Sequence, residues 1–200
     1  GVIGAKIVAD AAHDGYTVLV TSSSFVINPS FHKDLPFEVV RDFAPVTNIT
    51  ATEAFILGVT PDFPAKSVQE LIARAKAPGS QISFGSPGVG NVLHLVAELF
   101  KSRTGIPMVH VPYKGAAPAI TGLIGGEVQV MFLTPPSSLQ QIESGRIRAL
   151  AYTGATRFAQ LPDVPTMAQA GVTGMDTLAS WTGMFAPAKT PPAILARLHQ

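Results

Sequence analysis

The sequence predicts an α/β protein with two lobes, each a mostly parallel sheet flanked by helices. Between Ser67 and Tyr152, helix and strand patterns alternate four times, with one pair in roughly every twenty residues. The run from Val128 to Leu133 is apolar throughout, as expected for a strand that is covered on both faces. Apolar residues make up 46% of the 200 residues, which is enough for one large core or two small ones.

The first part of the chain has a weaker pattern. Apolar residues at helical spacing over 3–12 predict a helix that ends at Asp14-Gly15. The segment 16–20 is typical of a buried strand, and it leads into a predicted loop of hydroxyl residues over 21–24. We expect the stretch 28–43, which contains two prolines, to be irregular.

From Ser67 onward, most helices are marked by both a periodicity and a stop signal. Ser67 and Glu70 form a capping-box pattern ahead of a helix that ends at Pro78-Gly79. A strand over 181–186 precedes a final helix, for which we expect Thr190 as the cap and Pro191 in the first turn. The other predicted elements are a strand at 82–84, a helix from Val92 to Phe100, a strand at 108–111, a helix from Pro118 to Gly125-Gly126, a strand at 128–133, a short helix around Leu139 and Ile142 ended by Gly145, and a strand at 147–152.

Two lobes joined by crossing segments fit this order better than one continuous sheet. We place the crossings near 47–52 and 171–177. The first lobe then comprises residues 1–50 and 172–200, and the second lobe comprises 51–171. Because helical spacing starts with the first residues, we expect a segment upstream of this chain to be missing.

The composition excludes several classes of function. The chain has 14 Lys and Arg against 13 Asp and Glu, and the basic residues are scattered, so no nucleic-acid or anionic-membrane partner is expected. It has no cysteine, which excludes disulfides and thiolate chemistry. The longest charge-free window, 77–97, is broken by Pro, Gly and Ser, which excludes a bilayer span there. The five histidines lack ligand spacing, and we expect neither a metal nor a cofactor.

Loops that follow strands are the first places to look for a ligand site, because ligands bind beyond the carboxyl ends of strands in open parallel sheets. The loop 85–91 is the strongest candidate. Its glycines let backbone N–H groups approach a ligand, and the N-terminus of the next helix favours an anion by about 0.3–1 kcal/mol. The same glycines also fit a tight turn without a ligand. The other candidate loops are Ser22-Ser23-Ser24, Tyr113-Lys114-Gly115 and Thr134-Pro135-Pro136.

The 85–91 loop is neither a nucleotide motif nor a nucleophile elbow. Leu93 stands three residues after Gly90, where a dinucleotide fingerprint needs glycine, and the chain has no Gly-Lys-Ser/Thr sequence. An elbow needs glycine two residues on either side of its serine, whereas Ser86 has Gly88 after it and Phe84 before it. Nucleotide phosphate and serine hydrolysis are therefore disfavoured.

Individual side chains near these loops have two interpretations each. His94 lies one turn into the helix after the loop, where it could orient the loop, contact a ligand or only pack that turn. It is the histidine that we single out. Tyr113 and Lys114 could recognise a carboxylate, and they also fit an ordinary exposed turn.

A series of short motifs recurs along the chain in a familiar order and covers essentially all of it. The series is similar to the TctC/Bug family, the periplasmic substrate-binding receptors of tripartite tricarboxylate transporters. The motifs are Asp14-Gly15-Tyr16-Thr17-Val18-Leu19, Gly85-Ser86-Pro87-Gly88-Val89-Gly90 with His94 and Glu98, Val111-Pro112-Tyr113-Lys114-Gly115 with Pro118, Gly125-Gly126-Glu127-Val128, Arg148-Ala149-Leu150-Ala151, Leu161-Pro162-Asp163-Val164-Pro165-Thr166, and Ala186-Pro187 with Thr190-Pro191.

The resemblance implies a monomeric, periplasmic, two-lobe (Venus-flytrap) receptor without catalysis. Such a receptor captures a small organic carboxylate and delivers it to the membrane subunits of a tripartite tricarboxylate transporter. Its ligand is held by backbone amides and hydroxyls of loops from both lobes. The candidate ligand-binding residues are Ser22, Ser23, Ser86, Gly88, Val89, Gly90, Asn91, His94, Tyr113 and Thr134.

The chain departs from the family pattern at its ends and at a few positions. The resemblance implies that an N-terminal strand of the first lobe, and further elements beyond the final helix, are missing from this chain. Asn91 stands where Ser is common, and Leu133 stands where Asp is common, so the resemblance implies a plain or aromatic carboxylate rather than an amino acid. Two other functions stay open. One is an enzyme on the same scaffold with Ser86 or His94 as its catalyst, acting on a small carboxylate or its ester. The other is a ligand-sensing module that signals to a protein partner.

Overall fold

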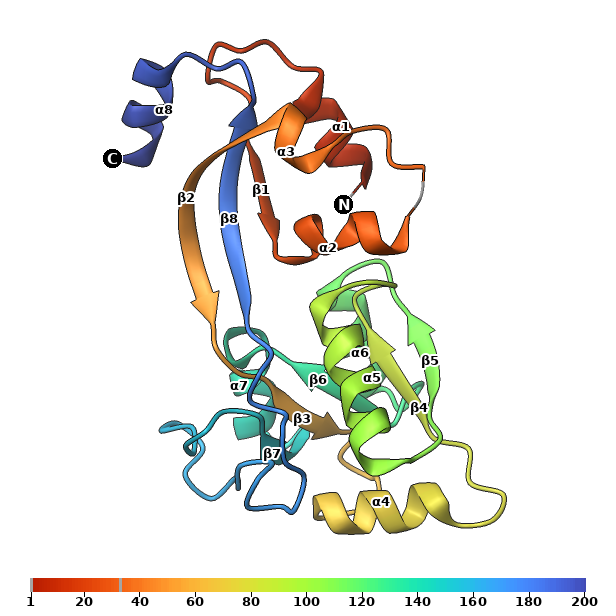
Figure 1. The fold of residues 1–200 in the computed structure, drawn as a ribbon. Helices are drawn as coiled ribbons and strands as arrows, with labels where there is room; N and C mark the ends of the chain where they lie inside the picture. Colours follow the sequence, from red (N-terminus) through yellow and green to blue (C-terminus); the bar gives the residue numbers. More distant parts are fainter. Residues whose placement is uncertain (1, 33) are drawn as a thin grey trace. The chain divides into compact units, whose positions relative to one another are not determined.

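The computed structural model describes residues 2–32 and 34–200 (Figure 1). The chain divides into two compact units, of which unit 1 comprises residues 1–51 and 180–200 and unit 2 comprises residues 52–179. The elements in chain order are α1 (Val2–Ala9), β1 (Leu19–Ser22), α2 (Ser24–Phe31), α3 (Val39–Asp42), β2 (Phe43–Thr52), β3 (Ile56–Val59), α4 (Val68–Lys76), β4 (Ser83–Ser86), α5 (Val92–Thr104), β5 (Val109–Pro112), α6 (Ala116–Ile124), β6 (Val130–Leu133), α7 (Pro135–Glu143), β7 (Arg148–Tyr152), β8 (Ser180–Pro187) and α8 (Pro192–His199).

The sheet of unit 2 is mostly parallel, as the sequence predicts. Its strand order is β5-β4-β6-β3-β7, and β4 pairs in parallel with both β5 and β6. The four helix-strand pairs between α4 and β7 match the predicted alternation. Strand β3 was not predicted, and it pairs antiparallel with both β6 and β7. Its four residues are all buried, but an apolar run this short gives no periodicity to recognise.

Helices cover both faces of this sheet, which explains the continuous apolar character of β6. Val130 and Phe132 point into a core that includes residues of α4 and α5, while Met131 and Leu133 join a separate core with α6. The capping box is also present, since Ser67 Oγ accepts a hydrogen bond from the Glu70 N–H at 3.2 Å.

Residues 172–179 lie in unit 2, whereas we expected them in the first lobe. Val172 and Met175 are buried in the same core as α4 and α5, and this packing holds the segment to unit 2. The chain enters unit 1 again at Ser180, where β8 begins.

Unit 1 differs more from the prediction. In its three-stranded sheet, of order β1-β8-β2, β1 runs antiparallel to β8, so this lobe does not have the mostly parallel sheet that we expected. Helix α1 ends at Ala9, and the supposed hydroxyl loop is the end of β1 and the start of α2. Helix α2 even contains Pro29, because its buried Phe25 anchors it against Phe43 with ring centroids 4.9 Å apart.

The cap of the last helix also differs from the prediction. Pro191, not Thr190, occupies the cap position of α8, and no side chain caps the helix. Thr190 is buried instead, and its Oγ1 has no hydrogen-bond partner within the described residues. No helix in the described part of the chain has the length and apolar character needed to cross a membrane.

Candidate functional site

Predicted loops of unit 2 come together at one edge of its sheet. Strands β4, β5 and β6 run in parallel, so the segments that follow them lie at the same edge. The first two are joined directly, because the Tyr113 N–H donates to Ser86 O at 2.9 Å and the Gly115 N–H donates to Pro87 O at 3.1 Å. Thr134 follows β6, the strand next to β4 on its other side.

The loop between β4 and α5 has the backbone that its glycines were expected to allow. Gly88 and Gly90 have φ of 147° and 75°, a region that other residues rarely enter. Asn91 then caps α5, since its Oδ1 accepts a hydrogen bond from the Leu93 N–H at 3.0 Å. The loop therefore ends at the N-terminus of a 13-residue helix, where the helix dipole favours an anion.

Most amides of this loop are already used within the protein. The Gly88 N–H donates to Ser86 Oγ at 3.2 Å, the Gly90 N–H to His94 Nδ1 at 3.3 Å, and the Asn91 N–H to Gly88 O at 3.2 Å. Val89 is different. It is 56% exposed, and nothing within the described residues accepts a hydrogen bond from its N–H. The Val89 amide is thus a loop donor that is available to a ligand.

Ser86 is fully buried at the end of β4 and contacts a histidine that the sequence analysis did not single out. Its Oγ lies 2.7 Å from His110 Nε2, donates to Gly88 O at 3.1 Å and accepts from the Gly88 N–H. Ser86 therefore links the loop to β5. These contacts make it part of the loop's framework.

An aromatic stack lies against the loop and consists of the rings of His110, His94 and Phe84. The ring centroids of His94 and His110 are 4.0 Å apart, and those of His110 and Phe84 are 4.8 Å apart. The parallel register places Phe84 beside His110, and α5 brings His94, whose side chain is only 14% exposed, against His110 with its ring centroid 6.2 Å from that of Phe84.

The stack favours neutral histidines. Burial, with His94 and Lys101 acting in the same direction and Glu98 in the opposite one, lowers the pKa of His110 to about 4. Burial also lowers the pKa of His94, again with Lys101 acting in the same direction and Glu98 in the opposite one. Both rings are therefore uncharged near neutral pH.

The remaining predicted residues of unit 2 are engaged in local contacts. The Tyr113 hydroxyl donates to Glu127 Oε2 at 3.0 Å, and burial together with this hydrogen bond raises the pKa of Tyr113. Thr134 Oγ1 lies 2.8 Å from Ser137 Oγ, at the first turn of α7. Leu133 is fully buried in the core with α6, so a ligand at the surface does not meet its side chain.

Two predicted residues lie in unit 1 and are described there alone. Ser22 is the last residue of β1 and is half-buried. Ser23 is buried, with its N–H donating to Trp181 O at 2.9 Å and its Oγ 3.0 Å from Ser180 Oγ. These contacts tie the end of β1 to the start of β8.

His110 was missed because its partners are far away in sequence. It lies 24 residues from Ser86, and no motif spans the two strands. One indication was available. His110 precedes Tyr113 by three residues in the strand that follows β4 in a predicted strand-helix-strand unit, and such strands are usually neighbours with their ends at one edge.

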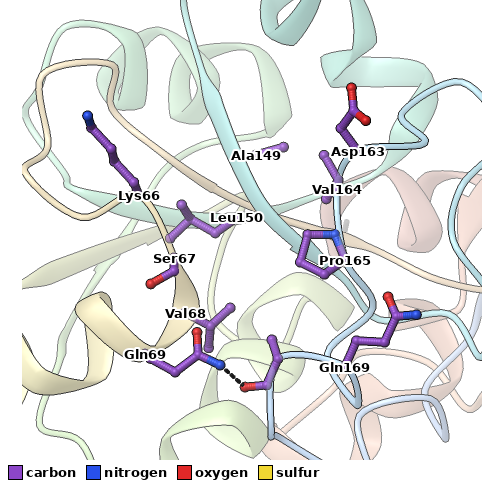
Figure 2. Close-up of a pocket in the computed structure, with 11 residues that line it drawn as sticks. Lys66, Ser67, Val68, Gln69, Ala149, Leu150, Asp163, Val164, Pro165 and Gln169 are labelled. Atoms are coloured by element: carbon purple, nitrogen blue, oxygen red, sulfur yellow. Dashed lines mark hydrogen bonds between the residues drawn. The ribbon is translucent and has the colours of Figure 1, made fainter.

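A pocket of about 350 Å³ lies elsewhere in unit 2, beside the start of α4 (Figure 2). It contains none of the predicted site residues. Its polar groups are largely engaged, because Gln69 Nε2 donates to Ala170 O at 2.9 Å and Gln169 Oε1 accepts from Arg157 and from the Thr166 N–H. Lys66 and Asp163 stand apart on its rim. The glycine loop remains the better candidate, since it offers an accessible donor and a helix terminus.

Comparison with protein families assigns the chain as a whole. Residues 1–200 match the TctC family, described as the tripartite tricarboxylate transporter family receptor. The chain belongs to this family. Among its relatives is the UPF0065 protein in the tcbD-tcbE intergenic region of Pseudomonas sp. (strain P51), 38% identical over all of this chain and 59% of the relative. Protein BugT of Bordetella pertussis is 36% identical over all of this chain and 61% of its own length. This TctC/Bug chain thus spans about 60% of these relatives.

Solved structures agree with the family. R. palustris Rpa4515 with adipate superposes with a TM-score of 0.93 at 37% identity, over 99% of this chain and 66% of that protein. MatC (Rpa3494) from Rhodopseudomonas palustris with bound malate gives a TM-score of 0.89 at 27% identity, over 98% and 67%. The predicted α/β fold of the periplasmic-binding-protein type is therefore confirmed, and so is the family resemblance.

Proposed function

We propose that this chain is the larger part of a periplasmic receptor that binds a small organic carboxylate without turnover. The receptor would deliver this carboxylate to the membrane subunits of a tripartite tricarboxylate transporter. The observation that carries the proposal is the Val89 amide, which has no acceptor within the described residues and lies just before α5, in a chain whose similar solved structures include one with adipate and one with bound malate.

The predicted residues of unit 2 would play two different parts, because some of their polar groups already form hydrogen bonds within the loop and others do not. The Val89 N–H and the NH2 group of the Asn91 side chain, whose Oδ1 caps α5, would be available to meet a carboxylate group. Ser86, Gly88 and Gly90 would act by holding the backbone in shape, because their polar groups already bond within the loop. In unit 1, Ser22 and Ser23 stay candidate ligand residues.

The test is a thermal-shift and calorimetric screen of the protein against adipate, malate, aromatic acids, tricarboxylates and amino acids. NMR spectra of each mixture, followed over hours, would detect conversion. We expect stabilisation by one class of carboxylate with the compound unchanged. The absence of a shift with every acid would contradict the proposal.

A pair of matched glycine variants separates binding from folding. Gly90 and Gly79 have φ of 75° and 76°, so replacing either by alanine introduces a similar backbone strain of about 1 kcal/mol or more. Gly79 lies after α4, in a turn where an added Cβ meets nothing within 4 Å. We expect both variants to lose stability, and only Gly90→Ala to lose affinity for the acid identified in the screen.

One observation favours the enzyme alternative enough to include it in this test. The 2.7 Å contact between Ser86 Oγ and His110 Nε2 has the length of a nucleophile-base pair. However, Ser86 is fully buried, and within the described residues nothing bonds to His110 Nδ1 to orient the ring. Conversion of a carboxylate or its ester that Ser86→Ala abolishes would favour catalysis over the receptor.

A further inference from the structure

The side chains of His110 and His94 each contact the β4–α5 loop through one ring nitrogen. His110 Nε2 contacts Ser86 Oγ at 2.7 Å, and His94 Nδ1 accepts the Gly90 N–H at 3.3 Å. We propose that His94 and His110 are positioning residues for this loop, and that the loop keeps its binding conformation only while the His94 ring is uncharged. This inference rests on the proposed function for its role in binding, but the loop geometry itself can be tested without a ligand.

The contacts of Ser86 fix the proton on His110. The single hydroxyl proton of Ser86 is donated to Gly88 O, and its oxygen accepts the Gly88 N–H. All three contacts of Oγ are satisfied together only if His110 also donates, from a protonated Nε2. With the proton on Nδ1, Ser86 would have to donate to His110, and Gly88 O would lose its partner.

The contact with Gly90 fixes the proton on His94 in the same way. Because Nδ1 accepts the Gly90 N–H, the proton of the neutral ring must lie on Nε2. Protonation at Nδ1 would place two N–H donors against each other. The bond to Gly90 would then be lost, and the turn at the start of α5 would loosen.

The surroundings of the stack make a charge on it unfavourable. Glu98 and Lys101, both on α5, are the charged side chains that act on the two rings within the described residues. Glu98 Oε1 lies 3.8 Å from His94 Nε2, but it also pairs with Lys101 Nζ at 2.9 Å. Two protonated rings with centroids 4.0 Å apart would repel each other. The pair is thus sensitive to acid.

The first experiment needs no ligand. NMR of the full chain labelled with ¹⁵N, from about pH 7.5 to about pH 4, reports the tautomer of each ring and the exchange of the Gly90 amide proton. We expect the Nε2–H tautomer for both histidines and a protected Gly90 amide at neutral pH. On acidification, we expect this amide to lose at least about tenfold protection, after correction for intrinsic exchange.

Conservative variants separate positioning from packing. In His94→Asn, the side-chain oxygen replaces Nδ1 as an acceptor and cannot be protonated, so protection of Gly90 should persist in acid. His94→Phe keeps the stacked ring but removes the acceptor, so protection should be low at every pH. His110→Gln can still donate to Ser86, whereas His110→Phe cannot. His13→Asn, at an exposed histidine of unit 1, is the matched control and should change nothing.

The second experiment measures adipate binding by calorimetry over the same pH range. On acidification, we expect the affinity of the parent chain for adipate to fall about tenfold more than the affinity of His94→Asn. The curve of His94→Asn serves as the reference, because it contains the effect of the titration of adipate itself. His110→Phe should bind about five- to tenfold more weakly than His110→Gln at neutral pH. Circular dichroism would show that each variant is folded.

The outcomes are distinguishable. An Nδ1–H tautomer on either ring, or equal loss of Gly90 protection in the parent and in His94→Asn, would overturn the inference. If the expected tautomers and protection are found but adipate and the other acids do not bind, the positioning role stands and the proposed function falls.

Discussion

A substitution of Asn91 can raise the stability of the protein while it lowers the affinity for a carboxylate. Its side chain caps the 13-residue helix α5, and it lies two residues from the available Val89 amide. Asn91→Ala removes the cap and should cost about 1 kcal/mol, or about 2–4 °C in melting temperature for a chain of this size. Asn91→Asp keeps the cap, and its negative charge at the helix N-terminus should contribute about 0.3–1 kcal/mol.

Binding should respond differently to the same charge. Since two residues span at most about 7 Å, we take about 6 Å as the separation between a carboxylate held at the Val89 amide and an aspartate at position 91. Two like charges at about this distance repel by about 0.7 kcal/mol in a medium like water and by about 3 kcal/mol at an effective dielectric constant of about 20. Asn91→Asp should therefore bind a carboxylate about 3- to 100-fold more weakly while it melts at the same or a higher temperature.

Thermal unfolding and calorimetry with adipate, or with the acid found in the screen, would measure both effects. Added salt should reduce the loss of affinity in Asn91→Asp but not the loss of stability in Asn91→Ala. Asn91→Ser should restore the cap without a charge. If Asn91→Asp gained stability and bound the acid as tightly as the parent, an anion site at this helix terminus would be refuted.

Three further predictions concern the framework of unit 2. Leu57→Ala in the fully buried β3 should cost about 2–5 kcal/mol by chemical denaturation, and a smaller loss would contradict the interior position of this strand between β6 and β7. In Gly122→Ala the new Cβ would collide with the Tyr113 ring, so the bond to Glu127 should break and the raised pKa of Tyr113 should fall in an ultraviolet titration; an unchanged titration would contradict this packing. The pKa of His110 falls from an ordinary value of 6.5 to about 4 in the folded protein, so the unfolded chain binds a proton more readily. The resulting contribution to stability is fully present above pH 6.5 and is lost as the pH falls from 6.5 to about 4. After a discount for solvent screening we expect about 1–2 kcal/mol, so His110→Gln should be less acid-sensitive in urea unfolding, and equal sensitivity would count against the assignment.

The second half of the fold could be predicted from the sequence because its local rules agree with its packing. The capping box at Ser67, the apolar stripe of α5 and the glycines after α6 each predict a boundary that the structure has. Strand β3, the strand pairing of unit 1 and its helix α2 could not be predicted in this way. There, long-range pairing decides the structure, as between Leu19 and Phe185, and helix α2 passes through Pro29 because Phe25 is buried.

The candidate site could be predicted as a position but not as a network. The glycine loop and the neighbouring Tyr113 both follow from the order of strands and loops. The bond between Ser86 and His110 does not, because it depends on the register between two strands. A sequence pattern therefore indicates where amides gather, while the tertiary contacts decide which of them are free.

This division between free and engaged amides also bears on selectivity. The bonds to Ser86 and His94 give the loop its shape before any ligand arrives, so binding need not order it. Under the proposed function, the Val89 amide and the helix dipole would recognise a carboxylate group whatever is attached to it, and at an exposed site the dipole contributes only about 0.3–1 kcal/mol. Much of the affinity, and the discrimination between one acid and another, must then come from contacts with the rest of the ligand. Variation at a loop side chain such as Asn91 should therefore change which acid is bound, whereas variation at Ser86, His94 or His110 should change how well any acid is bound.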